Sequence, residues 1–311
     1  MTTPDLSVSL CGISLRNPLV LASGILGTSA ELLERVARCG AGAVTSKSCG
    51  PTLRAGHPNP TVLAWGHGLI NAVGLSNPGA DEEARILRDA KARLAPLGVP
   101  LIASIFAETV AGFGEVARKV AEAAPDFIEV NISCPNVEAE FGRPFAADAR
   151  DAAAVTAAVR RAVSLPIIVK LSPNVSDIAA IARAVEAEGA DAVSAINTLG
   201  PGMVIDTDSG KPILANRTGG VSGPAIRPIA VRCVYDVSRA VRVPVIGIGG
   251  VACGRDAAEM IMAGATAVGI GTAVYDRGPG VFAAIGEELR AFMASHGYTA
   301  VSQMRGLAHD D

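Results

Sequence analysis

The sequence predicts an α/β protein built as a single (β/α)8 TIM barrel over residues 1–311, with long loops at the C-terminal mouth of the barrel. Short β-rich runs recur eight times along the chain, and a segment with helical periodicity follows each run. The runs are apolar throughout, as expected for parallel strands that are covered on both faces. The chain is longer than a usual domain, but α/β barrels routinely reach this length as one unit.

Strand and helix segments alternate from one end of the chain to the other. The expected strands occupy residues 18–22, 43–46, 100–105, 127–132, 166–171, 192–196, 244–248 and 267–270. The expected helices are rich in Ala, Glu and Arg and occupy residues 30–38, 81–94, 114–124, 148–163, 176–188, 224–240, 256–263 and 281–294. This repeat is typical of a parallel barrel with an outer ring of helices.

Composition and charge argue against several classes of protein. The net charge is −3 and no basic block occurs, which argues against nucleic acid as the main partner. The apolar runs are strand-sized, and residues 1–10 contain neither a basic start nor an apolar signal core, so we expect a cytoplasmic protein with no membrane segment. The six cysteines are widely spaced and form no C-x-x-C pair, so neither a metal site, a cluster nor disulfides are expected.

Polar side chains stand at the ends of several predicted strands. Lys47 lies between two serines at the end of strand two, Asn131 ends strand four, Lys170 lies in strand five, and Asn197 with Thr198 follows strand six. In a (β/α)8 barrel these ends meet at one mouth, where catalytic groups gather. Taken singly, each lysine could simply reach solvent, but their shared position predicts a common site.

Cys134 follows the fourth strand in the loop Asn131-Ile132-Ser133-Cys134-Pro135-Asn136. A thiol between two amides can act as a base, while Asn131 and Asn136 offer donors and acceptors to a flat polar ligand. A lone cysteine is more often an inert buried side chain, so the neighbouring residues have to support the catalytic interpretation. Connections at 49–79, 199–223 and 137–147 exceed the usual length and predict lids or substrate walls.

Glycine-rich turns follow the last two predicted strands. They are Gly247-Ile248-Gly249-Gly250 and Gly269-Ile270-Gly271-Thr272, and Ser222-Gly223-Pro224 could add donors. Glycines allow backbone N–H groups to approach an anion closely, and this is the usual phosphate position of the fold. A mononucleotide such as FMN would place its ring over the mouth, where Lys47 or Lys170 could stabilise negative charge on the reduced flavin. With Cys134 on the other side of a flat substrate, the pattern predicts a dehydrogenation.

Ordered motifs over almost the whole chain closely resemble the class 1 dihydroorotate dehydrogenases. They include Asn71-Ala72-Val73-Gly74-Leu75, the Cys134 loop, Asn197-Thr198, Ala215-Asn216-Arg217-Thr218-Gly219-Gly220 and Ser222-Gly223-Pro224-Ala225-Ile226. The resemblance implies oxidation of dihydroorotate to orotate in pyrimidine biosynthesis, with Cys134 taking the C5 proton and FMN taking the C6 hydride. The cysteine indicates class 1, because the membrane-bound class 2 enzymes use serine.

The resemblance also implies a set of binding residues. For the substrate these are Lys47, Asn71, Ala72, Val73, Gly74, Leu75, Asn131, Asn136, Asn197 and Thr198. For FMN they are Ser23, Lys47, Ser48, Ser104, Asn131, Lys170, Ile196, Gly223, Gly249, Gly250, Gly271 and Thr272. Ser104 stands where relatives commonly have Asn, and its hydroxyl cannot offer both amide functions.

Within class 1, the loop residues 138–145 and the long 197–223 stretch look more like class 1B. That subclass implies a homodimeric FMN barrel joined in a heterotetramer to a subunit that carries FAD and a [2Fe-2S] cluster and passes electrons to NAD. A self-contained, fumarate-dependent class 1A enzyme is the alternative within the family.

Three other functions remain open. A dihydropyrimidine dehydrogenase module has similar chemistry and would act on uracil or thymine. A flavin-free lyase or isomerase could use Lys170 or Lys47 as a Schiff-base nucleophile. A non-catalytic ligand-binding barrel would not need the Cys134 thiol.

Overall fold

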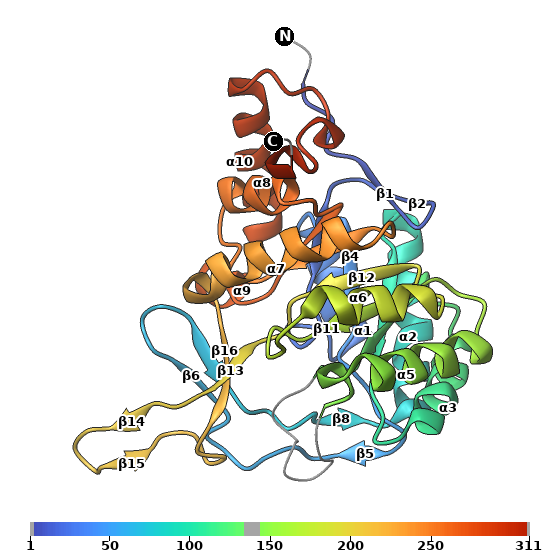
Figure 1. Cartoon of the computed structure of the whole chain (residues 1–311), viewed down its shortest axis with the longest axis vertical. Helices are drawn as coiled ribbons and strands as arrows, with labels where there is room; N and C mark the ends of the chain where they lie inside the picture. The colour runs from blue at the N-terminus through green and yellow to red at the C-terminus, as the bar shows by residue number, and fades with distance from the viewer. Residues whose placement is uncertain (1–2, 134–143, 310–311) are drawn as a thin grey trace.

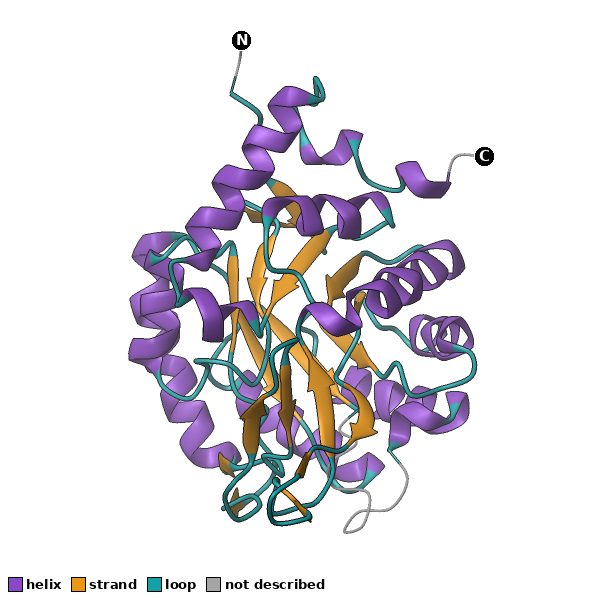
Figure 2. Cartoon of the chain, turned by 90° about the vertical axis from the view of Figure 1, so that its left-hand side faces the viewer, coloured by secondary structure: helices purple, strands orange, loops and turns teal. Residues whose placement is uncertain are grey.

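Eight parallel strands form a closed barrel in the computed structural model, which describes residues 3–133 and 144–309. In chain order they are β3 (Leu19–Leu21), β4 (Ala43–Thr45), β9 (Leu101–Ile105), β10 (Phe127–Asn131), β11 (Ile167–Leu171), β12 (Ala192–Ala195), β17 (Val245–Ile248) and β18 (Ala267–Ile270). Each pairs in parallel with the next, and β18 closes the barrel on β3 (Figure 2). The predicted (β/α)8 barrel is confirmed, and all eight expected strands are present.

Helices surround the barrel (Figures 1 and 2). They are α1 (Ala30–Arg38), α2 (Ala80–Leu94), α3 (Val110–Ala121), α5 (Ala149–Ala162), α6 (Ile178–Ala187), α7 (Arg227–Ala240), α8 (Gly254–Met262) and α10 (Val281–Ser295). The prediction missed the start of α3, where the Thr109 side chain accepts a hydrogen bond from the Gly112 backbone N–H. Glycines at 112 and 114 hid this start, because glycine is a poor helix former.

The half of the barrel interior nearer the amino ends of the strands, here called the lower half, is apolar. Each of the eight strands contributes one apolar side chain to it, and these are Val20, Ala43, Ile102, Phe127, Ile168, Ala192, Ile246 and Ala267. A hairpin of β1 (Val8–Leu10) and β2 (Ile13–Leu15) joins this cluster through Leu10 and Leu15, both fully buried. The interior at this end is therefore packed solid and leaves room for a ligand only at the other end.

Two long connections at the opposite end join into one antiparallel sheet. Strands β6 (Val62–Ala64) and β7 (Leu69–Asn71) come from the first connection, and β13 (Leu199–Gly202) and β16 (Gly219–Ser222) come from the second. Their order is β13-β16-β7-β6, so β7 and β16 pair although about 150 residues separate Asn71 from its register partner Gly220. Both connections therefore form a wall at this end of the barrel, as expected, while residues 137–143 of the third expected excursion lie outside the described residues.

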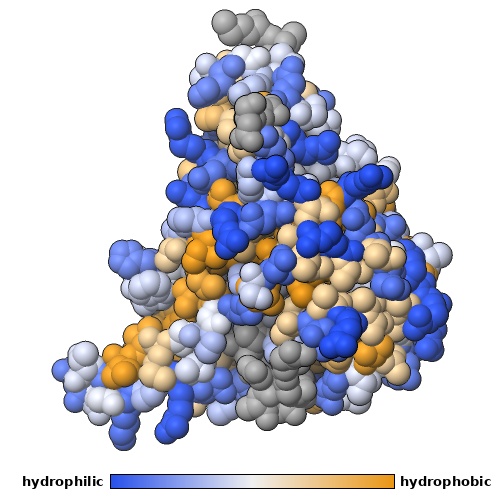
Figure 3. Space-filling model, in the orientation of Figure 1, coloured by the Kyte–Doolittle hydropathy of each residue, from blue (hydrophilic) through white to orange (hydrophobic). Residues whose placement is uncertain are grey.

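The second connection also extends away from the barrel as an arm. Strands β14 (Ile205–Asp206) and β15 (Lys211–Pro212) form its hairpin, which projects from the molecule in Figure 1. Apolar side chains are visible along this arm in Figure 3, and Met203 and Ile205 are about half exposed. A smaller pair, β5 (Leu53–Arg54) and β8 (Asn77–Pro78), ties the two ends of the first connection together. Over the described part of the chain, no helix has the length and apolar character needed to cross a membrane.

Candidate active site

A cavity of about 1320 Å³, its open mouth included, lies at the carboxyl ends of the barrel strands. The ends of seven of the eight barrel strands, all except β9, and both wall strands β7 and β16 contribute to it. Of the residues predicted from the sequence, the lining includes Ser23, Lys47, Ser48, Asn71, Val73, Gly74, Leu75, Asn131, Lys170, Ile196, Asn197, Thr198, Gly223, Gly249, Gly250, Gly271 and Thr272. The fold thus brings together side chains that lie up to about 250 residues apart in the sequence.

Two described residues of the predicted site, Ala72 and Ser104, are not part of this lining. Cys134 and Asn136 lie outside the described residues. Ala72 is fully buried and packs with Ile70 and Leu214 behind the wall. Ser104 is fully buried beneath Ser48, one layer below the cavity, so it is placed to act on a ligand only through its neighbours.

Ser23 and Ser48 form the polar floor of the cavity, and both contact Ser104 beneath it. The Ser48 Oγ lies 2.8 Å from the Ser104 Oγ and 3.0 Å from the Ser23 Oγ. The Asn131 Nδ2 donates to the Ser48 Oγ at 3.1 Å, which ties the end of β10 to the end of β4. Below them the Ser104 Oγ donates to the Glu129 carboxylate at 3.1 Å. Ser23 is partly buried and the other four residues are buried, and all of them are hydrogen-bonded, as buried polar groups must be to avoid a desolvation cost.

A second polar group joins the ends of β10 and β12. The Asn131 Oδ1 accepts from the Ser133 backbone N–H at 3.3 Å and from the Ser133 Oγ at 3.0 Å. The Asn197 Nδ2 donates to the Ser133 Oγ at 2.8 Å, while the Asn197 Oδ1 accepts from the Thr198 N–H. Both amides are therefore held in one orientation and present a fixed pattern of donors and acceptors to a planar ligand.

The two lysines reach the cavity from different depths. Lys170 lies within β11 opposite Asn131 and is 5% exposed, whereas Lys47 lies just beyond β4. Behind Lys47, on α2, the Glu83 side chain is 1% exposed. Burial raises the pKa of the Glu83 carboxyl to about 7, and the Ser46 hydroxyl and the Lys47 cation partly oppose this shift. Two cations at one mouth give the site a positive field suited to an anionic ligand.

The turn after β7 is held from its outer side. The Arg54 Nε donates to the Gly74 carbonyl at 2.7 Å, and the His57 Nδ1 lies 3.1 Å from the Ala72 carbonyl. Gly74 and Leu75 both have positive φ, at 74° and 57°. A Cβ on Gly74 would lie 2.7 Å from the His57 ring, so only glycine fits this close approach. The carbonyls of Ala72 and Gly74 are thus engaged by Arg54 and His57, while Val73, Gly74 and Leu75 line the cavity.

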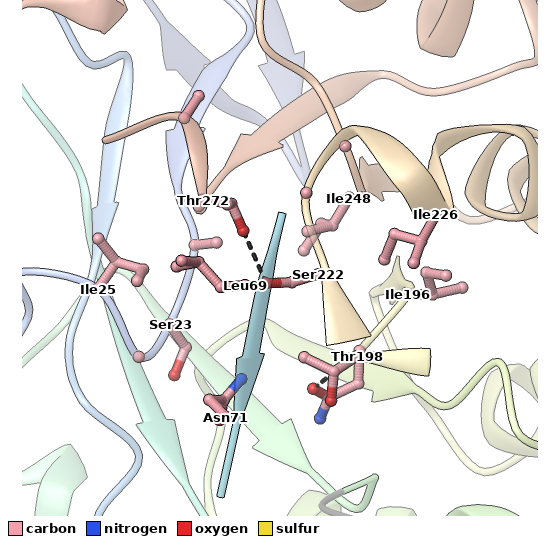
Figure 4. Close-up of a pocket in the computed structure, with 18 of the residues that line it drawn as sticks. Ser23, Ile25, Leu69, Asn71, Ile196, Thr198, Ser222, Ile226, Ile248 and Thr272 are labelled. Carbon is pink, nitrogen blue, oxygen red and sulfur yellow. Dashed lines mark hydrogen bonds between the residues drawn. The ribbon is translucent and has the colours of Figure 1, made fainter. Parts of the chain in front are cut away.

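Glycines and hydroxyls form the other end of the cavity. Gly223 and Gly250 adopt positive φ, and a Cβ on Gly250 would lie 2.8 Å from the Gly223 carbonyl oxygen. The Ser222 and Thr272 hydroxyls lie 2.8 Å apart above them (Figure 4). This compact backbone cradle, with hydroxyls beside it, suits the phosphate of a mononucleotide.

Sequence reasoning identified Ile196 but missed several other apolar residues of the lining. Ile226 and Ile248 lie beside Ile196 on one side of the cavity, and Ile25 lies on the other (Figure 4). Such residues resemble ordinary core residues in the sequence, although the alternation of β17 could have placed Ile248 inside the barrel. The short helix α9 (Ala273–Arg277), which adds Asp276 to the lining, was also not predicted.

Comparison with known proteins gives a consistent answer. The family model described as dihydroorotate dehydrogenase matches residues 5–293. Curated relatives named dihydroorotate dehydrogenase B (NAD(+)), catalytic subunit, include proteins from Methanosarcina mazei (49% identity, 98% of this chain and 96% of the relative) and Methanothermobacter thermautotrophicus (47%, 98% and 99%). A protein of the same name from Geobacter sulfurreducens is 44% identical over 98% of this chain and 99% of its own length. The chain therefore belongs to the dihydroorotate dehydrogenase family, as a member of class 1B.

Proposed function

We propose that this chain is the FMN-containing catalytic subunit of a class 1B dihydroorotate dehydrogenase, which oxidises dihydroorotate to orotate in pyrimidine biosynthesis. One observation carries the proposal. In a chain of this family, the fold gathers a set of oriented amides, two lysines and a glycine cradle around a single cavity. In this proposal residues 1–311 form one FMN-binding domain.

The amides match the shape of the proposed substrate. A pyrimidine dione presents N–H and C=O groups along its edges, and Asn71, Asn131 and Asn197 can pair with them. Lys47 and the backbone edge of the Val73–Leu75 turn would hold the carboxylate, because a cation and backbone N–H groups both favour an anion. Asn136 would add a further amide from the loop that carries Cys134.

The residues present fit a flavin mononucleotide. The Gly223–Gly250 cradle would hold the phosphate, and Ser23, Ser48 and Ile196 would contact the ring system. Lys170 would stabilise negative charge on the ring, since a buried cation acts strongly at low dielectric. When bound, the flavin supplies the acceptor for the substrate hydride.

Cys134 is the proposed base and takes the proton from C5 of the substrate. A thiol has an ordinary pKa of about 8.5, so the rate should rise with pH as the thiolate fraction rises. The electrons leave with the C6 hydride, so proton and hydride depart from adjacent carbons and a C=C bond forms. Lys47, Asn131 and Asn197 keep the substrate plane fixed while this happens.

The name of the relatives as catalytic subunits supports a separate electron-transfer subunit. We propose that this partner carries FAD and a [2Fe-2S] cluster and delivers electrons to NAD, and that the barrel itself is a homodimer within a heterotetramer. The experiment is to express the barrel with and without its partner and assay NAD and fumarate as acceptors. NAD reduction that requires the partner supports the proposal, and fumarate-dependent turnover by the barrel alone would indicate class 1A.

The substrate is tested by anaerobic stopped-flow reduction of the bound flavin. Dihydroorotate should bleach the flavin absorbance and dihydrouracil should not. Cys134→Ala should slow this reduction by about 1000-fold while flavin content stays the same, because a positioned general base contributes this much. A protein that purifies without flavin would instead favour the Schiff-base alternative through Lys170, and an unchanged rate in Cys134→Ala would exclude Cys134 as the base.

A further inference from the structure

Glu129 is a buried acidic residue for which the proposed function gives no role. It lies in β10 and is 3% exposed. Each of its carboxylate oxygens accepts one serine hydroxyl, Oε1 from Ser104 in β9 at 3.1 Å and Oε2 from Ser194 in β12 at 3.2 Å. Both serines are fully buried. Glu129 lies two residues before Asn131, whose side chain lines the cavity. Burying a carboxylate costs free energy, so a buried carboxylate at this position needs a structural reason.

The two serines differ in what lies beyond them. Ser104 contacts Ser48, which lines the cavity, and its Oγ also lies 3.3 Å from the Ser23 Oγ. The Ser194 hydroxyl has Glu129 as its hydrogen-bond partner in the described structure, and Ser194 is not part of the cavity lining. One carboxylate oxygen is therefore connected to the cavity floor, and the other anchors the side chain.

We propose that Glu129 is a positioning residue that fixes the direction of the hydrogen-bond chain through Ser104 and Ser48 and thereby the orientation of the Asn131 amide. The inference deepens the proposed function and rests on it for the identity of the ligand, but the direction of the chain follows from hydrogen-bonding capacity alone.

A carboxylate only accepts hydrogen bonds, and a serine hydroxyl has a single hydrogen to donate. Ser104 gives its hydrogen to Glu129, so across the 2.8 Å contact Ser104 must accept from Ser48. Ser48 has then used its own hydrogen and can only accept from Asn131. The amide nitrogen of Asn131 is therefore turned toward Ser48.

The orientation of the Asn131 amide also determines what its oxygen and its second N–H can bind. With Nδ2 directed to Ser48, the Asn131 Oδ1 faces Ser133 and accepts both its backbone N–H and its hydroxyl. Among the described residues Ser48 is the acceptor for the Asn131 Nδ2, so the second hydrogen is available to a ligand and Asn131 acts toward the cavity as a donor. Without an acceptor-only group at the base of the chain, the serine hydroxyls could reverse, and the Ser133 donors alone would then oppose a turn of the Asn131 amide. In the turned amide, a ligand carbonyl would meet an oxygen instead of an N–H group.

Ser104 and Ser194 provide a matched pair of variants. Ser104→Ala and Ser194→Ala each remove one fully buried hydroxyl from the same carboxylate, but only Ser104→Ala breaks the connection to Ser48. Glu129→Gln keeps the shape and introduces a donor. We expect Ser104→Ala and Glu129→Gln to weaken orotate binding about tenfold, measured by perturbation of the flavin spectrum, because a mispaired buried amide costs about 1.4 kcal/mol. Ser194→Ala should stay within about twofold of the wild type.

Neutron diffraction of the deuterated wild-type holoenzyme tests the direction of the chain without any substrate. The expected deuterium positions are Ser104 toward Glu129, Ser48 toward Ser104 and the Asn131 amide toward Ser48. The inference is overturned if the Ser48 deuterium points away from Ser104, or if Ser194→Ala weakens orotate binding as much as Ser104→Ala. A wild-type protein that shows this chain but is not reduced by dihydroorotate would overturn the proposed function and leave the role of Glu129 standing.

Discussion

The same eight strands line both halves of the barrel interior, but the lower layer is apolar throughout, whereas the layer above it contains the buried polar residues Thr45, Ser104, Glu129, Lys170 and Ser194. Ile102, Phe127 and Ala192 pack at the bottom, and two residues further along the same strands stand Ser104, Glu129 and Ser194. In a β-strand every second side chain points to the same face. The residue two positions further along a barrel strand therefore also points into the interior, one layer higher. One layer holds the barrel together, and the next supports the cavity.

The polar layer is stable because its groups bond to one another. Each oxygen of Glu129 has a serine partner, and Ser48 has partners in three residues. Glu83, outside the barrel on α2, shows the contrast, because its Oε1 is buried and has no hydrogen-bond partner among the described residues. The comparison indicates that substitutions in the lower layer should cost stability, and substitutions in the upper layer should cost function. Four predictions test it.

Phe127→Ala should have the largest effect on stability. The ring is fully buried at the centre of the lower layer, and its removal leaves a cavity that costs about 3–5 kcal/mol of the free energy of unfolding. Urea denaturation of the flavin-loaded protein measures this loss. The orotate affinity of the folded fraction should stay within about twofold of the wild type. A tenfold loss of affinity would show that the lower layer also contributes to ligand binding.

Lys170→Met should show the opposite pattern. The aliphatic part of the side chain is kept, so stability should change by less than about 1 kcal/mol. Flavin reduction by dihydroorotate should slow by about 100-fold, because a buried cation that stabilises developing negative charge is lost. Stopped-flow absorbance gives the rate, and the reduction potential of the flavin should fall as well. An unchanged potential would mean that Lys170 does not act on the flavin.

Glu83→Gln should change how stability depends on pH. The folded protein keeps a proton on Glu83 up to about pH 7, while the unfolded chain releases it near pH 4.5. Stability from this group is therefore greatest below pH 4.5 and falls as the pH rises through 7. Between pH 5 and 8 the wild type should lose about 2 kcal/mol more than Glu83→Gln, as measured by urea denaturation. Equal losses in both proteins would show that Glu83 ionises normally.

Ile205→Ser should have the smallest effect. Ile205 is about half exposed on the projecting β14–β15 arm, far from both interior layers (Figure 1). Surface substitutions of this kind usually change stability by less than about 0.5 kcal/mol. Thermal unfolding and flavin reduction should both match the wild type. A clear loss of either would show that the arm contributes to the barrel or to the cavity.

Much of the fold could be predicted because barrel strands carry a strong local signal. The expected strands at 100–105 and 166–171 are apolar except for one polar residue in the penultimate position, Ser104 and Lys170, so both the strands and the face of the site were readable. Lys170 and Asn131 were placed at one mouth for the same reason. Ile25 and Ile226 were missed, because apolar lining residues look like core residues until the chain is folded.

By itself, the sequence determined the number and order of the strands, the end of the barrel that carries the site, and the family to which the chain belongs. These properties depend on periodicity and on short motifs, which are local. Only the tertiary structure decided that β7 and β16 pair to form one wall, that Ser104 lies behind the cavity floor, and that Glu129 connects to Asn131 through two serines. Those contacts join distant segments, and their hydrogen bonds exist only once the strands are in register.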